Sequence, residues 1–151
     1  MDKKFNVLIL GGGLAGMFIA LNLPKEIKIA IVMKDTKDIA NSELAQGGIA
    51  AVLSKDDEAL KKHIEDTLTA GSNINDLDAT KTLVYEASEN IEKLMEFGVE
   101  FDKDKEGHLL LAQEGGHRGR RILRAGGDAT GREIMKALKK RIVEKENNTD
   151  H

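Results

Sequence analysis

The hydrophobic and polar positions at the beginning of the chain follow two different periods. Residues 5–10 form a short aliphatic run, which predicts a buried strand. Residues 14–23 are apolar on nearly every side and stop at Pro24, which predicts a buried helix. Residues 27–33 are again mostly apolar and predict a second strand. Such a β-α-β unit of about thirty residues implies a parallel strand pair with a right-handed crossover.

Further along, polar loops separate segments with helical periodicity. Ser54 and Asp57 predict a capping box for a helix over residues 57–69, with Gly71 just past its end. Asp76 or Asp78 begins a longer helix, which ends at Gly98. Its apolar positions recur at intervals of three and four: Leu83, Val84, Ala87, Ile91, Leu94 and Met95.

The last part of the chain predicts a strand pair and a further helix. Residues 99–101 and 109–111 are short apolar runs that predict two strands. Thr130 and Glu133 predict a second capping box, which opens a helix over residues 131–145. The polar residues 146–151 predict a frayed tail. The segments 42–52 and 114–128 show no clear period, and both are rich in glycine.

Composition excludes several classes of function. The chain has 151 residues, about one domain, a net charge of -3 and 3% aromatic residues, so nucleic acid is not an expected partner. The absence of cysteine excludes disulfides, iron–sulfur clusters and cysteine-ligated zinc, and fits a cytoplasmic setting. The four histidines lack metal-ligand spacing, so no metal is expected.

The uncharged run after Lys3 and Lys4 also fits a signal peptide. Gly11, Gly12 and Gly13 interrupt this run and favour the strand–helix interpretation. No other segment approaches the ~20 apolar residues that span a bilayer, so no membrane partner is expected.

The first motif with chemical meaning is the glycine triplet Gly11-x-Gly13-x-x-Gly16. It follows a predicted strand and opens a predicted helix, which is the context of a dinucleotide-binding turn. Gly11 permits the tight turn, Gly13 lets backbone approach a pyrophosphate, and Gly16 lets the helix pack close to the sheet. The pyrophosphate would lie on the free N–H groups at the helix start. The alternative is a glycine-rich turn without a ligand.

The acidic residue that binds a ribose at the end of the second strand is missing. Met33 stands at that position, Lys34 follows it, and the first acid, Asp35, comes two positions late. The glycines favour NAD binding, but the missing acid weakens that interpretation. Lys34 is either a phosphate contact or a solvated lysine at a strand end.

A second motif runs from Asn41 to Gly48 (NSELAQGG). Its small residues would let backbone lie against a flat ring system, while Ser42 and Gln46 supply hydrogen-bonding groups. An ordinary turn before a buried, alanine-rich segment is the alternative.

A third motif combines acid, histidine and arginine in a glycine-rich stretch. Glu114 and His117 precede four arginines, at positions 118, 120, 121 and 124. Such a group can bind and orient a small dianion, and His117 can act as a general acid or base. The alternative is a basic surface loop.

Together, the three motifs resemble the N-terminal part of the L-aspartate oxidases. These flavoenzymes are grouped with the flavoprotein subunits of succinate dehydrogenase and fumarate reductase. The resemblance covers residues 5–142 and includes the stretches 42–52, 114–117 and 126–133 (GGDATGRE). It implies an α/β fold: a Rossmann-like FAD-binding domain with a parallel sheet and flanking helices, incomplete relative to the family.

The resemblance also assigns roles to residues. Glu114 matches a glutamate that orients L-aspartate, His117 is a second catalytic candidate, and Lys34 matches a lysine beside the adenosine part of FAD. The residues matched to the pyrophosphate turn are Gly11, Gly12, Gly13, Leu14, Ala15 and Gly16. Those matched to the segment along the flavin are Asn41, Ser42, Glu43, Leu44, Ala45, Gln46, Gly47 and Gly48.

Asn41 separates the branches of this family. Succinate dehydrogenase flavoproteins usually carry a histidine here that is joined to FAD, so asparagine implies non-covalent FAD. Arg118, Gly119 and Arg124 depart from the usual pattern, which has serine, a polar or basic residue, and histidine at these places.

The resemblance implies oxidation of L-aspartate to iminoaspartate, with oxygen or fumarate as acceptor, as the first step of de novo NAD biosynthesis. Residues 1–151 would be the N-terminal portion of the FAD-binding domain, without the capping and C-terminal helical domains. The chain alone is then expected to be inactive and to need the remainder of the enzyme. The alternatives are a fumarate reductase-like flavoprotein and a nucleotide-binding module without catalysis.

Overall fold

The protein is described here from a computed structural model that covers residues 4–34, 40–54 and 56–147. It begins with the predicted β-α-β unit: β1 (Val7–Leu10), α1 (Leu14–Asn22) and β2 (Ile29–Val32). The two strands pair in parallel, with Val7 opposite Ile29 and Leu10 opposite Val32, and α1 packs on one face of the pair. The parallel sheet with flanking helices that the sequence predicts is confirmed. The first strand is shorter than expected at its start, and the second is shorter at both ends.

The segment after this unit forms a short helix and part of a second sheet. Helix α2 (Asn41–Leu44) leads into β3 (Ile49–Ala50). Strand β5 (Ile122–Leu123) lies in the middle of this sheet and pairs antiparallel with β3 on one side and with β4 (Leu111–Ala112) on the other. The predicted pairing of 99–101 with 109–111 is therefore wrong. Only an isolated bridge joins Lys103 to Leu109, because the true partner of β4 lies in the glycine-rich stretch that showed no period.

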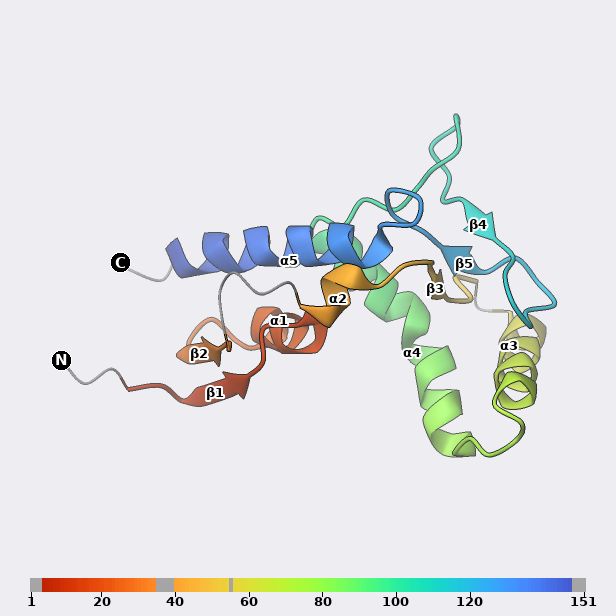
Figure 1. Cartoon of the computed structure of the whole chain (residues 1–151), viewed down its shortest axis with the longest axis horizontal. Coiled ribbons are helices and arrows are strands. Elements are labelled where there is room, and N and C mark those ends of the chain that lie inside the picture. The colour runs from red at the N-terminus through yellow and green to blue at the C-terminus, as the bar shows by residue number, and fades with distance from the viewer. Residues whose placement is uncertain (1–3, 35–39, 55, 148–151) are drawn as a thin grey trace.

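Two helices form an arm beside the second sheet (Figure 1). Helix α3 (Asp57–Ala70) begins at Asp56, whose carboxylate accepts the N–H of Glu58 at 3.0 Å. The predicted Ser54–Asp57 capping box is wrong because Asp56 is the N-cap. Gly71 ends α3 as expected. Helix α4 (Leu77–Glu96) is capped by Asp76, one of the two predicted candidates.

The last helix, α5 (Thr130–Asn147), crosses the molecule and contacts α1 and α2 (Figure 1). The predicted capping box is wrong here too, because the N–H of Glu133 donates to the carbonyl oxygen of Ala129 and not to Thr130. The Thr130 hydroxyl has other partners, described below. The predicted frayed tail at 146–151 lies partly outside the described residues, and helix α5 includes its first two positions.

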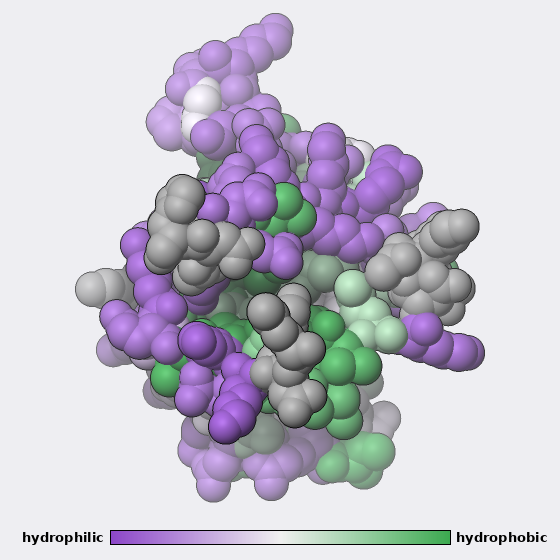
Figure 2. Space-filling view, turned by 90° about the vertical axis from the view of Figure 1, so that its left-hand side faces the viewer, coloured by the Kyte–Doolittle hydropathy of each residue, from purple (hydrophilic) through white to green (hydrophobic). Residues whose placement is uncertain are grey.

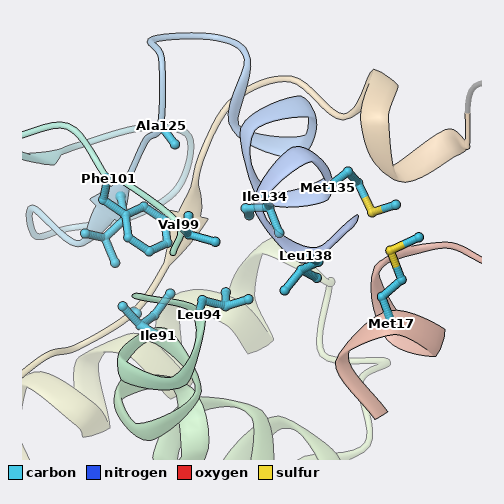
Figure 3. Packing of buried hydrophobic residues seen from close by; sticks show 11 residues of the cluster. Met17, Ile91, Leu94, Val99, Phe101, Ala125, Ile134, Met135 and Leu138 are labelled. Atoms are coloured by element: carbon cyan, nitrogen blue, oxygen red, sulfur yellow. The ribbon is translucent and has the colours of Figure 1, made fainter. Parts of the chain in front are cut away.

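The main hydrophobic core lies between α4, α5 and the second sheet, and reaches α1 (Figure 3). Met135 and Leu138 on α5 are fully buried, and Met17 on α1 faces Met135. On α4, Val84, Ile91 and Leu94 are buried as the periodicity predicted, whereas Leu83 is 67% exposed. None of the described helices is long and apolar enough to span a bilayer.

Candidate functional site: a nucleotide turn and an adjoining segment

The start of α1 has the geometry of a phosphate-binding turn. Gly13 is the N-cap, with extended backbone and no side-chain cap, so the first N–H groups of the helix have no carbonyl partner within it. A Cβ on Gly16 would lie 2.2 Å from the carbonyl oxygen of Gly11, which no real structure tolerates. Gly11 itself has φ +113°, as its predicted turn requires. The glycines therefore let helix and strand meet closely, and no side chain of the N-cap residue itself covers the helix start.

The predicted flavin segment reaches this turn through one hydrogen bond. The Leu14 N–H donates to Ser42 Oγ at 3.2 Å, across 28 positions of sequence. A Cβ on Gly13 would meet the same Ser42 Oγ at 3.3 Å and nothing closer. The structure thus brings the first two predicted motifs together, although the sequence did not indicate which side chain would join them.

Helix α5 fixes the other side of residues 41–48. The Gly131 N–H donates to the carbonyl oxygen of Ala45 at 3.1 Å, and the Thr130 hydroxyl donates to that of Gly47. A Cβ on Gly131 would lie 2.1 Å from the carbonyl oxygen of Ser42, so only glycine fits there. Further along, Lys139 pairs with Glu43. The segment is held from both sides, between the starts of α1 and α5.

Met33 stands at the end of β2, where the ribose-binding acid is missing. Met33 lies against the phosphate turn, where a Cβ on Gly12 would be 2.1 Å from the Met33 sulfur. A flexible thioether thus occupies the place where a ribose-binding carboxylate was sought. Lys34 is exposed, and its role beside the adenosine stays a prediction. Asp35, the acid that comes two positions late, lies outside the described residues.

Glu114 is held by Arg124, the last arginine of the third motif, a pairing that the sequence did not indicate. Arg124 Nε donates to Glu114 Oε1 at 2.8 Å, and Arg124 Nη2 contacts the same oxygen. Arg124 Nη1 lies 3.4 Å from Asp128. The Glu114 and Arg124 side chains are both about one-third exposed (36% and 37%), so this pair borders solvent.

Arg118 and Arg121 both form hydrogen bonds with Asp66 on α3. Its buried carboxylate accepts the backbone N–H of Arg118 at 2.9 Å, the Arg118 side chain at 2.5 Å and Arg121 Nη1 at 2.9 Å. Burial alone would raise the pKa of Asp66, but these hydrogen bonds outweigh it and lower the pKa. Arg118 and Arg121 therefore neutralise a buried acid and do not converge with Arg124 on a common anion.

His117 lies beside a second histidine, His63, on the buried face of α3. The two rings meet edge to face with centroids 5.4 Å apart, and His117 Nδ1 lies 3.4 Å from Arg121. His63 is 2% exposed, and its Nδ1 has no hydrogen-bond partner within the described ranges. Burial, together with the nearby charges of Arg121 and His117, lowers the pKa of His63 to about 4.

Sequence reasoning missed three contributors: Asp66 and His63 on α3, and Gly131 on α5. A signal for the first two was available. They occupy the apolar face of α3 beside Leu60 and Ile64, where polar residues need a specific partner. Gly131 lies in the stretch 126–133 that carries the resemblance, but its close contact was not indicated, because its neighbours lie more than eighty positions earlier in the chain.

Two other features do not add to this site. A pocket of about 630 Å³ lies between α3 and residues 118–121, but none of residues 41–48 lines it. Asp104, Glu106 and His108 come within 4.8 Å of one another in an exposed turn. Asp104 already accepts the N–H groups of Glu106 and His108 there, so the cluster is explained as a turn.

The glycine N-cap of α1, the close glycine contacts and the doubly anchored segment fit a dinucleotide cofactor. Comparison with known proteins identifies its class. Residues 6–150 match the family described as FAD binding domain. The chain belongs to this family of FAD-dependent flavoproteins, and FAD is its cofactor.

Individual proteins also match the chain in sequence. The chain is 44% identical over 145 residues to the L-aspartate oxidase of Acinetobacter baylyi, and 38% identical over 145 residues to that of Bacillus subtilis. These matches cover 96% of this chain but only 26% and 27% of the two relatives. The chain thus spans about a quarter of the length of the curated relatives it matches.

Solved structures place the fold in the same group. The Sdh1 complex of Mycobacterium smegmatis, in its apo form, matches with a TM-score of 0.84 and 27% identity, over 95% of this chain and 25% of the matched one. Quinol fumarate reductase of E. coli matches with a TM-score of 0.82 at 24% identity, over 93% and 24% of the two chains, and shows likeness of fold.

Proposed function

We propose that this chain is the N-terminal part of the FAD-binding domain of an L-aspartate oxidase. The observation that carries the proposal is the identity of 37–44% to proteins named L-aspartate oxidase, over most of the chain. The solved Sdh1 and fumarate reductase neighbours are at most 28% identical over a similar span. The substrate of the whole protein is then L-aspartate and its product iminoaspartate, in the first step of de novo NAD biosynthesis.

The proposed roles come from the family resemblance, and the contacts between the turn and residues 41–48 support them. The N–H groups after Gly13 would bind the pyrophosphate, and residues 41–48 would lie along the ring system. Lys34 would contact the adenosine part. The side chain of Asn41 cannot form the imidazole link of the succinate dehydrogenase branch, so FAD would be held non-covalently. When bound, FAD accepts the hydride that leaves the Cα of L-aspartate, and oxygen or fumarate takes the electrons afterwards.

Glu114 would orient the substrate through its ammonium group. Arg124 contacts only Oε1 of Glu114, and Oε2 has no hydrogen-bond partner in the described part of the chain. A carboxylate with one oxygen fixed and the other free can accept a hydrogen bond from an ammonium in a defined direction. His117 is held between His63 and Arg121, and a proton-transfer role for it stays a prediction of the sequence.

A fumarate reductase-like activity is the second candidate, supported by the likeness to the solved Sdh1 complex. The third is a nucleotide-binding module without catalysis, supported by the turn at the start of α1. A cytoplasmic location remains an expectation from composition.

Two measurements separate the candidates. The purified chain is mixed with FAD, and bound flavin is followed by its visible spectrum after gel filtration. In parallel, the chain replaces the matched segment of the Acinetobacter baylyi relative, and this chimera is assayed with L-aspartate and with fumarate. We expect turnover of L-aspartate by the chimera. Flavin binding by a chimera that reduces fumarate but leaves L-aspartate unchanged would favour the second candidate, and flavin binding without turnover of either would favour the third.

A further inference from the structure

Asp102 lies between the two chain segments that carry Glu114 and Arg124. Its backbone N–H donates to the carbonyl oxygen of Arg124 at 2.8 Å. Its own carbonyl oxygen accepts the N–H of Leu110 at 2.9 Å, one residue before the strand β4 that leads to Glu114. Phe101, the residue before Asp102, is 3% exposed and belongs to the main core. Asp102 therefore follows an anchored residue and joins both segments through its backbone.

The Asp102 side chain holds the loop that follows Arg124. Each carboxylate oxygen accepts one N–H: Gly126 donates to Oδ1 at 3.0 Å, and Gly127 donates to Oδ2 at 3.1 Å. Both glycines have positive φ, +59° and +67°, a backbone conformation that other residues rarely adopt. Figure 1 shows this loop, between β5 and α5, beside the segment between α4 and β4. The two hydrogen bonds thus turn the backbone toward Asp102 directly after Arg124.

Three carboxylates surround the Arg124 guanidinium. Glu114 accepts its hydrogen bonds, and an Asp128 oxygen lies 3.4 Å from Nη1. Glu114 raises the pKa of Arg124 through these bonds, and the nearby charges of Asp128 and Asp102 act in the same direction. The Asp102 oxygens face the glycine N–H groups and form no ion pair with Arg124 in the described ranges, so Arg124 pairs with the other two acids.

We infer that Asp102 is a positioning residue for Glu114. Its contacts set the path of the backbone at Arg124 and just after it, and this path determines where the guanidinium meets Oε1 of Glu114. Asp102 would act on the substrate only through these two side chains, and not by contact. The inference rests on the proposed role of Glu114 toward the ammonium of L-aspartate.

The first link is tested in the chain itself by hydrogen exchange. Asp102→Asn keeps the size of the side chain but replaces one accepting oxygen with an NH₂ group, so the N–H groups of Gly126 and Gly127 should lose protection. Unchanged exchange would overturn the inference. Asp104→Asn is the matched control, since the Asp104 carboxylate also accepts two backbone N–H groups, in a separate turn. Figure 2 shows hydrophilic surface where the segment between α4 and β4 projects from the molecule.

The second link is tested by kinetics in the chimera described above. Asp102→Asn should lower kcat/KM for L-aspartate by about fivefold, the equivalent of one misplaced hydrogen bond. The inhibition constant of succinate, which lacks the ammonium, should change less, whereas a residue that only stabilises the loop would weaken both ligands equally. Asp102→Glu keeps both accepting oxygens but moves them by one methylene, and provides a second, milder variant for the same comparison. Asp104→Asn should leave both constants unchanged.

A double-mutant cycle with Glu114→Gln makes the outcome decisive. If Asp102 acts through Glu114, adding Asp102→Asn to Glu114→Gln should cause no further loss of kcat/KM. All variants are compared at equal FAD content, so that unfolded protein is not counted as lost positioning. Losses that multiply, or equal losses for L-aspartate and succinate, would overturn the inference alone. Full turnover of L-aspartate by Glu114→Gln would instead contradict the proposed role of Glu114, and the inference with it.

Discussion

Arg124 binds Glu114 through two nitrogens that meet the same carboxylate oxygen, Oε1. The guanidinium is held on its other side by Asp128, at 3.4 Å. Glu114 is thereby fixed at one oxygen while the other faces no donor among the described residues. This relationship suggests that Arg124 orients the Glu114 carboxylate, which we propose orients the substrate.

The first prediction tests whether Arg124 orients Glu114. In the chimera, Arg124→Gln should lower kcat/KM for L-aspartate by about tenfold, the equivalent of one charge-assisted hydrogen bond of about 1.5 kcal/mol. Arg124→Lys keeps the charge and one hydrogen bond and should lose less. The urea midpoint should change little, because the pair borders solvent and such pairs contribute at most about 1 kcal/mol. Unchanged kinetics in Arg124→Gln would mean that the pair only fixes the loop.

The second prediction concerns Glu114 itself. Glu114→Gln in the chimera should weaken L-aspartate turnover by roughly ten- to 150-fold, the equivalent of about 1.5–3 kcal/mol for a charge-assisted hydrogen bond to the ammonium. Succinate lacks the ammonium, and its inhibition constant should change much less or improve. Equal losses for both ligands would show that Glu114 acts only on the shape of the site.

A third prediction tests how α5 holds the flavin segment. Gly131→Ala would place a Cβ only 2.1 Å from the carbonyl oxygen of Ser42. Backbone cannot give way as a side chain can, so the chain should lose flavin binding and about 1–3 kcal/mol of unfolding free energy. Gly116→Ala is the matched control, since its nearest neighbour would be 3.9 Å away. Binding is measured by the fluorescence quenching of added FAD. Equal binding by Gly131→Ala and Gly116→Ala would contradict the prediction.

The fourth prediction follows from Asn41. Acid precipitation of the FAD-loaded chimera should release all of its flavin into the supernatant, because an asparagine amide forms no covalent link to the ring. Flavin retained in the pellet, and visible by fluorescence on a denaturing gel, would place the protein in the histidine-linked branch.

The last prediction is a pH dependence of stability. Unfolded His63 takes up a proton near pH 6.5, whereas the folded side chain does so only at about pH 4, so the unfolded state binds more protons between these values. The unfolding free energy should therefore fall by at most about 3 kcal/mol as the pH is lowered through this window. Asp66 has a lowered pKa in the folded state and should cause a separate loss at lower pH.

Urea titrations at half-unit steps from pH 7 to pH 4 would measure this dependence. His63→Leu removes the titrating group and should flatten the curve between pH 6.5 and 4. A wild-type curve that is already flat in this window would contradict the assignment.

The parts of the fold that could be predicted from the sequence are those fixed by local pattern. The β-α-β unit and the helices α3, α4 and α5 were expected because periodicity and glycine positions act over a few residues. The pairing of β4 with β5 was not, because Leu111 and Leu123 meet through a glycine-rich stretch without a period of its own. The same holds for the site: the phosphate turn was readable, whereas the Arg124–Glu114 contact depends on how that stretch folds back.

The contacts of α5 constrain the order of events during synthesis. Lys139 pairs with Glu43, and Lys145 Nζ donates to the carbonyl oxygens of Ala20 and Leu23 at the end of α1, contacts that span 96 to 125 positions. A ribosome that has released only the first half of the chain has therefore made the nucleotide turn without the helix that fixes it. Loop closure over such separations is slow compared with local helix formation. The nascent β-α-β unit must then persist with the side of α1 that α5 covers exposed to water until α5 emerges, so early exposure to chaperones, rather than early capture of flavin, is the expected fate of the growing chain.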